Sequence, residues 1–350
     1  MKSIVRPLLA ALLLSACGAP QISAQAPPPA DPQMQAVLDE LGALHPKPIV
    51  KLSPQQARKQ PSPADAVKAL LQKQGKSTDP EAVGNVENTT VPGPAGPIPV
   101  RIYTPSGSGP FPVIFYIHGG GWVIATMDTY DSSPRAMVNL TNAMVVSVEY
   151  RKAPEHKFPA AHEDCYAALQ YVMKNAAKMK GDPRRVAVMG ESAGGNMATA
   201  VCMMARDRKG KMPLYEVLVY PVTNNDFHTP SYRKNASAKP LNKAMMEWFF
   251  RNTVKNASDG NNPYLAVLKG NVRGLPPATV ITDEIDPLMS EGKAYADKLQ
   301  KAGIAVRYTN YEGVAHEFFG MGAVVDKAKD AEAFAADGLK AAFGKRTASK

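Results

Sequence analysis

From Val86 onward, short apolar runs alternate along the chain with stretches of helical periodicity. Several of the runs are apolar on both faces, which is typical of parallel strands buried inside a sheet. Strands that alternate with helices over about 250 residues predict a doubly wound α/β sheet. The predicted strands are Val100–Tyr103, Val113–Ile117, Met144–Val148, Val186–Met189, Glu216–Tyr220, Ala278–Thr282 and Ala305–Tyr311.

Two segments depart from this alternation. Residues 31–80 predict two amphipathic helices, Met34–Leu44 and Pro63–Gln74, with proline-rich breaks beside them. Thr223–Asn262 lies between two predicted strands and has no strand pattern of its own. Because such sheets bind ligands at the carboxyl ends of their strands, an insertion there predicts a cap over a binding site.

The first residues have the pattern of an export signal. Basic residues precede the apolar run Leu8–Leu14, which is too short to span a bilayer. The Leu-Ser-Ala-Cys sequence at 14–17 resembles the bacterial lipobox, in which the cysteine is acylated after cleavage. We therefore expect a lipoprotein signal peptide at 1–16, a membrane anchor on Cys17 in the bacterial envelope and a Pro-rich tether at 17–30. Cleavage after Ala26 is the alternative and would give a soluble periplasmic protein, although Pro27 disfavours it.

The composition is that of a folded protein, with 45% hydrophobic residues and a formal net charge of +10. The densest basic stretch, Arg206–Lys211, is interrupted by an acid and a glycine, so we expect no nucleic-acid partner. Cys165 and Cys202 lie in apolar helical patterns and predict buried free thiols. Nothing in the pattern indicates an oligomeric state.

A G-x-S-x-G sequence occupies Gly190–Gly194. Alone it is a weak signal, but a strand pattern precedes it and the helical pattern Asn196–Val201 follows it, as in a nucleophile elbow. We expect Ser192 at the tip of the turn as a nucleophile, near a helix start that favours developing negative charge. The alternative is an ordinary glycine-rich turn.

A second glycine cluster, His118–Trp122, follows the predicted strand Val113–Ile117. Acyl transfer needs donors aimed at an oxyanion, and the backbone N–H groups of Gly120, Gly121 and Ala193 could supply them. The alternative is a flexible or phosphate-binding loop. A phosphate-binding loop would need Lys-Ser/Thr after its glycines, whereas Trp122 stands there.

Three segments together resemble the bacterial hormone-sensitive-lipase-like esterases: His118–Trp122, Tyr150–Ala161 and Gly190–Asn196. The resemblance extends from about Val86 to the last helix. It implies the α/β-hydrolase fold, with an eight-stranded, mostly parallel sheet, helices on both faces and a helical cap. It also implies a serine carboxylesterase that cleaves short- to medium-chain acyl esters and needs no cofactor.

The resemblance also bears on single positions. It implies that Arg151 and Glu155 brace the loop under the active site. The sequence departs from the family at Glu191, where aspartate is commoner, and at Lys152 and Lys157, where apolar residues or proline are commoner. The departure at Glu191 leaves the role of the nucleophile intact.

The expected domain organisation follows from these segments. Residues 31–80 form N-terminal cap helices, and 81–345 form the hydrolase domain with a cap insertion at about 223–262. An apolar stripe at helical spacing inside the insertion fits core packing, and in a cap it would equally line an acyl or alcohol pocket. The candidate pocket residues are Trp122, Met245, Trp248 and Phe249.

The base follows from chain order, which in this fold is Ser, then Asp or Glu, then His. Only two of the six histidines, His228 and His316, come after Ser192. His228 lies in the insertion, whereas His316 lies in the segment Glu312–Phe319 after the last predicted strand. We therefore expect His316 to be the general base.

Three acids follow the predicted strand Ala278–Thr282 and qualify by chemistry: Asp283, Glu284 and Asp286. Asp286 precedes Pro-Leu, as the acid does in the resembled family, so it is the first choice and Glu284 the second. We expect no metal, because His316 lacks a second histidine at metal-binding spacing and the chain has no closely spaced Cys pair.

Two rival functions remain open. An amidase, deacetylase or lactone hydrolase would use the same triad on a different substrate. A lipoprotein that only binds a ligand through an inactive hydrolase fold is the rival outside catalysis. The intact triad and oxyanion glycines argue against the second rival.

Overall fold

The computed structural model describes residues 26–344, and the expected signal peptide and Cys17 lie outside this range. Its centre is an eight-stranded sheet in the order β1-β2-β4-β3-β5-β6-β7-β8. The strands are β1 (Asn85–Gly93), β2 (Gly96–Thr104), β3 (Phe111–Ile117), β4 (Met144–Val148), β5 (Gly181–Glu191), β6 (Glu216–Val219), β7 (Ala278–Ile285) and β8 (Val306–Ala315).

The sheet has the predicted mostly parallel pairing. β2 runs antiparallel to both β1 and β4, and every other neighbouring pair is parallel. Every residue of β4 is buried, as expected for a strand covered on both faces. The α/β-hydrolase fold expected from the sequence is therefore confirmed.

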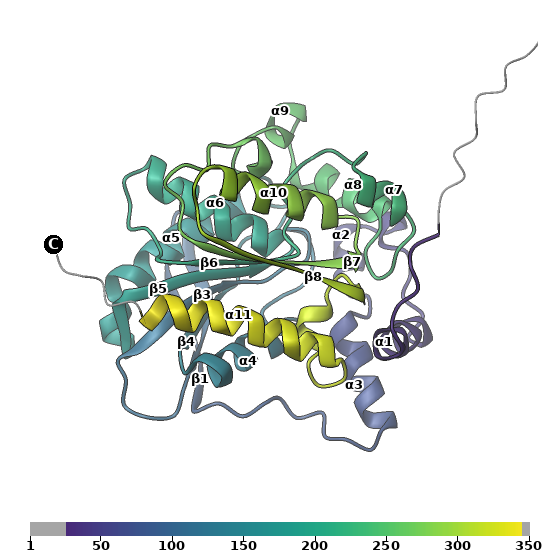
Figure 1. Ribbon diagram of the computed structural model, residues 1–350, viewed down its shortest axis with the longest axis horizontal. Coiled ribbons are helices and arrows are strands. Elements are labelled where there is room, and N and C mark those ends of the chain that lie inside the picture. The colour runs from purple at the N-terminus through teal and green to yellow at the C-terminus, as the bar shows by residue number, and fades with distance from the viewer. Residues whose placement is uncertain (1–25, 345–350) are drawn as a thin grey trace, which may run out of the picture.

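Helices cover both faces of the sheet (Figure 1). One face packs against α5 (Ala160–Asn175), α6 (Ala193–Asp207) and α10 (Met289–Lys301), and the other against α4 (Ser132–Thr141) and α11 (Asp326–Gly344). Each face has its own apolar core, so the sheet is a buried central layer.

Most of the remaining helices gather beyond the carboxyl ends of the parallel strands, whereas α9 (Ala257–Gly260) lies away from them at the top of the view (Figure 1). They come from the N-terminal segment and from the β6–β7 connection, which contains no strand between residues 223 and 262. Their bounds are α1 (Pro32–Ala43), α2 (Pro54–Ala57), α3 (Pro63–Lys73), α7 (Pro230–Lys234), α8 (Lys243–Thr253) and α9 (Ala257–Gly260).

Local sequence explains how the N-terminal helices begin. Asp31, Ser53 and Ser62 each accept a hydrogen bond from a backbone N–H of the first helical turn, and a proline follows each of them. These side chains accept hydrogen bonds from backbone N–H groups that have no partner within the helix. Proline costs no hydrogen bond at the first helical position, because an N–H there would be unpaired in any case.

The prediction missed β1 and made several strands too short, among them β2, β5, β7 and β8. β1 was missed because it is an edge strand whose side chains are mostly exposed, so it has no apolar run. β7 continues to Ile285 and β8 to Ala315, because the two strands pair beyond their apolar parts, with a bulge after Asp283. Asp286 and His316 consequently follow directly after strand ends.

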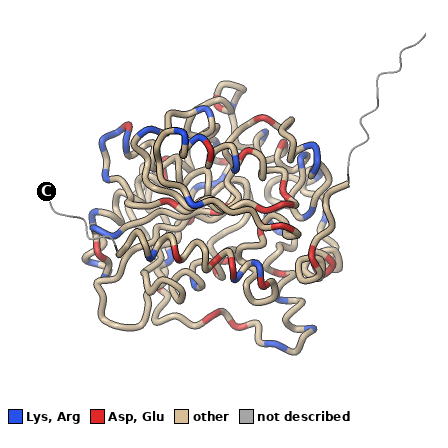
Figure 2. The backbone as a smooth tube through the Cα atoms, in the orientation of Figure 1, with Lys and Arg blue, Asp and Glu red and all other residues tan. Residues whose placement is uncertain are grey.

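The surface carries both signs of charge, and Figure 2 shows basic and acidic positions interspersed along the chain. Cys165 and Cys202 are buried and free, as predicted. Over residues 26–344, no helix combines the length and the apolar character needed to cross a membrane.

Candidate active site

Ser192 occupies the sharp turn between β5 and α6. Its backbone has φ +57° and ψ −119°, a strained conformation that costs a non-glycine residue about 1–3 kcal/mol. The turn is so tight that a Cβ added to Gly190 would lie only 2.2 Å from the carbonyl oxygen of Gly194. The predicted strand–turn–helix is therefore present, and it lifts the Ser192 hydroxyl out of the sheet.

The structure brings Asp286 and His316 to this serine. The His316 Nε2 atom lies 2.9 Å from the Ser192 Oγ atom, and its Nδ1 atom lies 2.7 Å from Asp286 Oδ2. All three residues are at most 5% exposed. The chain of hydrogen bonds is that of a serine-hydrolase triad.

The other candidates lie elsewhere. Glu284 accepts hydrogen bonds from Lys234 and from the backbone N–H of Gly313, and it makes no hydrogen bond to His316. His228 is exposed and pairs with Asp226. The geometry therefore favours Asp286 over Glu284 and His316 over His228.

Opposing influences set the pKa of His316. Burial of the imidazole disfavours its charged form, but the Asp286 carboxylate favours it, and Glu317 and Glu191 add to this effect. The net result is a pKa raised above the ordinary value. His316 is thus a stronger base than an isolated imidazole.

The glycine loop after β3 packs directly against the serine turn. A Cβ on Gly194 would lie 2.0 Å from the carbonyl oxygen of Ile117 and 2.6 Å from that of His118. Gly120 and Gly121 have φ +91° and +58°, values that favour glycine. A Cβ on Gly121 would lie 2.3 Å from the Phe249 ring. The glycines thus permit both the loop conformation and the close approach of α8.

The three candidate oxyanion donors are unengaged by the backbone. Within residues 26–344, the N–H groups of Gly120, Gly121 and Ala193 donate to no backbone carbonyl of the turns and loops. Ala193 starts α6, so its N–H also belongs to the positive end of a helix. These groups remain free to bind a developing negative charge.

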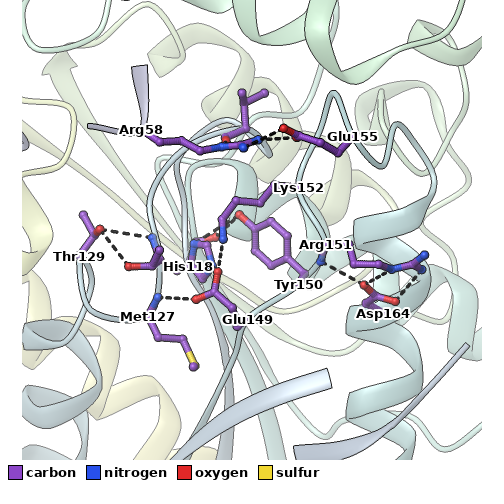
Figure 3. Close-up of polar contacts among 12 residues, drawn as sticks. Arg58, His118, Met127, Thr129, Glu149, Tyr150, Arg151, Lys152, Glu155 and Asp164 are labelled. Carbon is purple, nitrogen blue, oxygen red and sulfur yellow. Dashed lines mark hydrogen bonds and ion pairs between the residues drawn. The ribbon is translucent and has the colours of Figure 1, made fainter. Parts of the chain in front are cut away.

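Polar contacts hold the glycine loop from beneath (Figure 3). The Tyr150 hydroxyl lies 3.1 Å from the carbonyl oxygen of His118 and 2.8 Å from that of Gly119. Its ring stacks on the His118 ring with centroids 4.4 Å apart. Burial lowers the pKa of His118 to about 4, so this imidazole is neutral at physiological pH.

Arg58, which directly follows α2, adds a second support that the sequence did not reveal (Figure 3). It donates to the carbonyl oxygens of Val123 and Ala153, both at 2.8 Å, and pairs with Glu155 at 2.6 Å. The bracing role expected for Glu155 is confirmed, and it acts through Arg58.

The other residues of this segment brace it in different directions (Figure 3). Arg151 pairs with Asp164 of α5 at 2.8 Å, which confirms a structural role. Lys152 pairs with Glu149, whose second carboxylate oxygen accepts the backbone N–H of Met127 at 2.9 Å.

Glu191, beside the nucleophile, is buried among tyrosines. It accepts hydrogen bonds from Tyr116, at 2.5 Å, and from Tyr220. Burial raises its pKa to about 7, although these hydrogen bonds oppose the rise. Its carboxyl group is therefore engaged by the tyrosines.

Two further acids lie near the histidine: Asp283, which was one of the three candidate acids, and Glu317, which the sequence did not mark as a site residue. The Asp283 carboxyl is fully buried, and one of its oxygens lies within 4.8 Å of ligand atoms of both Asp286 and His316. Burial, reinforced by the Asp286 charge, raises the pKa of Asp283 well above its usual range and so favours its neutral form. The second acid, Glu317, lies 3.8 Å from His316 Nε2. No periodicity marks either position.

The four candidate pocket residues divide into two groups. Trp122 is buried in the main core, edge-to-face with Phe250. On α8, Trp248 and Phe249 are buried and in mutual contact, and Met245 is partly exposed. Of these, Phe249 approaches the glycine loop most directly, since its ring lies over Gly121.

Known proteins resemble this chain in both sequence and fold. Residues 114–320 match a family of proteins with the alpha/beta hydrolase fold. Carboxylesterase NlhH of Mycobacterium tuberculosis is 39% identical over 251 residues, which are 70% of this chain and 79% of that protein. The chain belongs to the hormone-sensitive-lipase-like α/β hydrolases.

Two further ester hydrolases are similar to this chain, one in sequence and one in structure. An ethyl acetate hydrolase of Pseudomonas putida is 31% identical over 288 residues, 81% of this chain and 88% of the relative. The hyperthermophilic esterase of the archaeon Pyrobaculum calidifontis has a TM-score of 0.82 at 35% identity, over 89% of this chain and 98% of that one.

Proposed function

We propose that this ester hydrolase cleaves short- to medium-chain acyl esters through an acyl-serine intermediate on Ser192. The observation that carries the proposal is the unbroken hydrogen-bonded series from Asp286 through His316 to the Ser192 hydroxyl. The ester hydrolases among its relatives support the reaction class.

In the acylation step, His316 Nε2 takes the Ser192 proton while Oγ attacks the ester carbonyl carbon. Asp286 stabilises the imidazolium that forms. The tetrahedral intermediate then collapses, the bond to the alcohol oxygen breaks, and Nε2 gives its proton to the departing alcohol. Water repeats the sequence on the acyl-serine and releases the carboxylic acid.

The negative charge of each tetrahedral intermediate falls on the former carbonyl oxygen. The N–H groups of Gly120, Gly121 and Ala193 are the proposed donors to it. Because the glycine loop is braced before substrate arrives, these donors need little rearrangement during the reaction.

We further propose that α8 limits the length of the substrate. Phe249 lies against Gly121, so a bulky group on this side of the serine would meet a buried aromatic ring. Met245 offers a softer wall that a longer chain could displace. The name of the Pseudomonas putida relative, ethyl acetate hydrolase, fits a preference for small acyl groups.

We also propose that the enzyme is exported and held at the bacterial envelope by a lipid on Cys17. The support is the lipobox at Leu14–Cys17, together with the short apolar run before it.

A substrate panel tests the proposed reaction. Purified protein that lacks residues 1–17 would be assayed on 4-nitrophenyl esters of increasing acyl length and on the matching 4-nitroanilides. We expect hydrolysis of the short and medium esters and much slower cleavage of the anilides, with Ser192→Ala as the background. Faster cleavage of anilides than of esters would favour the amidase alternative.

A further inference from the structure

The residue after the histidine of the triad has an unusual backbone conformation. Glu317 has φ +73° and ψ 3°, in the left-handed region that favours glycine. A side chain held in such a conformation next to catalytic groups is a reason to ask what that side chain does.

The Glu317 carboxylate is fixed between the imidazole and the glycine loop. Its Oε1 atom accepts a hydrogen bond of 2.6 Å from the Tyr130 hydroxyl. That hydroxyl in turn lies against Gly119, where an added Cβ would be 2.3 Å away. The same Oε1 atom lies 3.8 Å from His316 Nε2, the nitrogen that faces Ser192.

Glu317 also differs from the other acid beside the histidine in its exposure. Its side chain is 22% exposed, whereas that of Asp286 is completely buried. Within residues 26–344, no lysine or arginine forms an ion pair with Glu317. The titratable groups around it are His316, three acids and four tyrosines: Asp283, Asp286, Glu191, Tyr116, Tyr130, Tyr150 and Tyr220. Its charge is therefore not neutralised by a fixed cation.

The position of the Glu317 carboxylate can be compared with the place that the alcohol half of an ester would occupy. In the mechanism above, His316 Nε2 gives its proton to the departing alcohol oxygen, so the alcohol must lie beside Nε2. The Glu317 Oε1 atom is 3.8 Å from the same nitrogen, and a hydrogen bond from Nε2 to the alcohol oxygen is about 3 Å long, so the carboxylate lies within about 7 Å of that oxygen.

We propose that Glu317 determines specificity by charge, favouring esters of cationic or hydrogen-bond-donating alcohols and disfavouring esters whose alcohol part is anionic. The inference rests on the proposed function, because it assigns the substrate class of the same site. At this distance, a single carboxylate favours a cationic alcohol part through long-range electrostatic attraction as well as through direct contact.

Two esters of nearly equal shape test the role of Glu317. Acetylcholine carries a quaternary ammonium group where 3,3-dimethylbutyl acetate carries an uncharged tert-butyl group. The measured quantity is the ratio of kcat/KM for the cationic ester to that for the neutral ester. We expect Glu317→Gln to lower this ratio by about five- to tenfold, the order expected for unit charges roughly 3–4 Å apart with the dielectric constant of water between them.

Two further variants complete the experiment. Glu317→Gly removes the same charge and suits φ +73°, which offsets part of the cost of losing the acceptor of the Tyr130 hydroxyl, and it should lower the ratio equally. Glu312→Gln removes a charge from an exposed side chain of the same segment and should leave the ratio unchanged.

The outcomes separate the two proposals. Failure of the wild type to hydrolyse the neutral ester or any other short acyl ester would overturn the proposed function. Intact hydrolysis of the neutral ester, with the same ratio in the wild type, Glu317→Gln and Glu317→Gly, would overturn the role of Glu317 alone.

Discussion

At the scale of single residues, three acids surround the His316 imidazole, and each has a different position and a different role. Asp286 is buried and hydrogen-bonded to Nδ1, Asp283 is buried beside it with a raised pKa, and Glu317 is partly exposed near Nε2. Only Asp286 has the geometry to orient His316.

This division predicts unequal effects of isosteric substitutions. Asp286→Asn should lower kcat by roughly 10⁴, because an amide at this position can hold the wrong imidazole tautomer. Glu284→Gln should change kcat by only a few-fold, since Glu284 pairs with Lys234 and Gly313 instead. Steady-state kinetics on 4-nitrophenyl acetate would compare them. Equal losses would mean that Asp286 is not the acid of the triad.

The pH dependence of kcat/KM should report the pKa of His316. The imidazole must be neutral to accept the serine proton, so kcat/KM rises with pH through this pKa. Burial opposes protonation, but Asp286 and Glu317 outweigh it, so the inflection should lie above the ordinary value of 6.5.

Removing the Glu317 charge should then move the inflection to lower pH, because a neutral amide no longer favours the imidazolium. The profile of Glu317→Gln, measured beside that of the wild type and of Glu312→Gln, gives the comparison. A shift to higher pH in Glu317→Gln would contradict the assigned charge interaction.

At the scale of elements, the short helix α2 couples the N-terminal segment to the glycine loop. Arg58→Met would leave the carbonyl oxygens of Val123 and Ala153 without this donor, at about 1–3 kcal/mol for each group that stays unpaired. We expect a lower melting temperature and a several-fold lower kcat/KM, since the loop that carries the oxyanion donors loses its support.

Glu155→Gln is the matched control for this prediction. It weakens only a partly exposed ion pair, which contributes about 0–1 kcal/mol, and leaves the other two Arg58 hydrogen bonds in place. Thermal unfolding and kinetics would be measured on both variants. Equal losses in the two would show that the ion pair, and not the support of the carbonyls, is what α2 contributes.

The sequence predicts correctly those elements whose signal lies in neighbouring residues. β3 to β7 were found because their apolar runs are buried on both faces, and β2 and β8 were found from runs that are less completely buried. The serine turn was found because Gly190 and Gly194 flank it. β1 was missed because edge strands need no apolar run, and the ends of β7 and β8 because their last residues pair through backbone groups. Arg58 and Glu317 could not be found, since their roles depend on contacts distant in sequence and on a backbone angle.

At the scale of the whole molecule, the described chain begins close to the active site. The Asp31 N–H donates to the carbonyl oxygen of Gly313 at 2.8 Å, three residues before His316, and Lys327 pairs with Asp31 at 3.0 Å. A tether that ends here would leave the protein at the edge that holds the triad.

The proposed anchor predicts where the activity is found. Cys17→Ser should move esterase activity from the membrane pellet to the soluble fraction, because acyl chains hold the protein by about 0.8 kcal/mol for each buried methylene. Turnover on a soluble ester should not change. Mass spectrometry of the mature N-terminus gives a direct reading, and an unacylated chain that begins at Pro27 would contradict the anchor.

The central claim is that Ser192 is the nucleophile, and active-site labelling tests it most directly. A fluorophosphonate probe would be added to wild-type protein and to Ser192→Ala, followed by peptide mapping and by an assay of ester hydrolysis. We predict one adduct, on Ser192 of the wild type, with none in the variant and a loss of several orders of magnitude in its turnover. An adduct on another residue, or near-normal hydrolysis by Ser192→Ala, would contradict the mechanism.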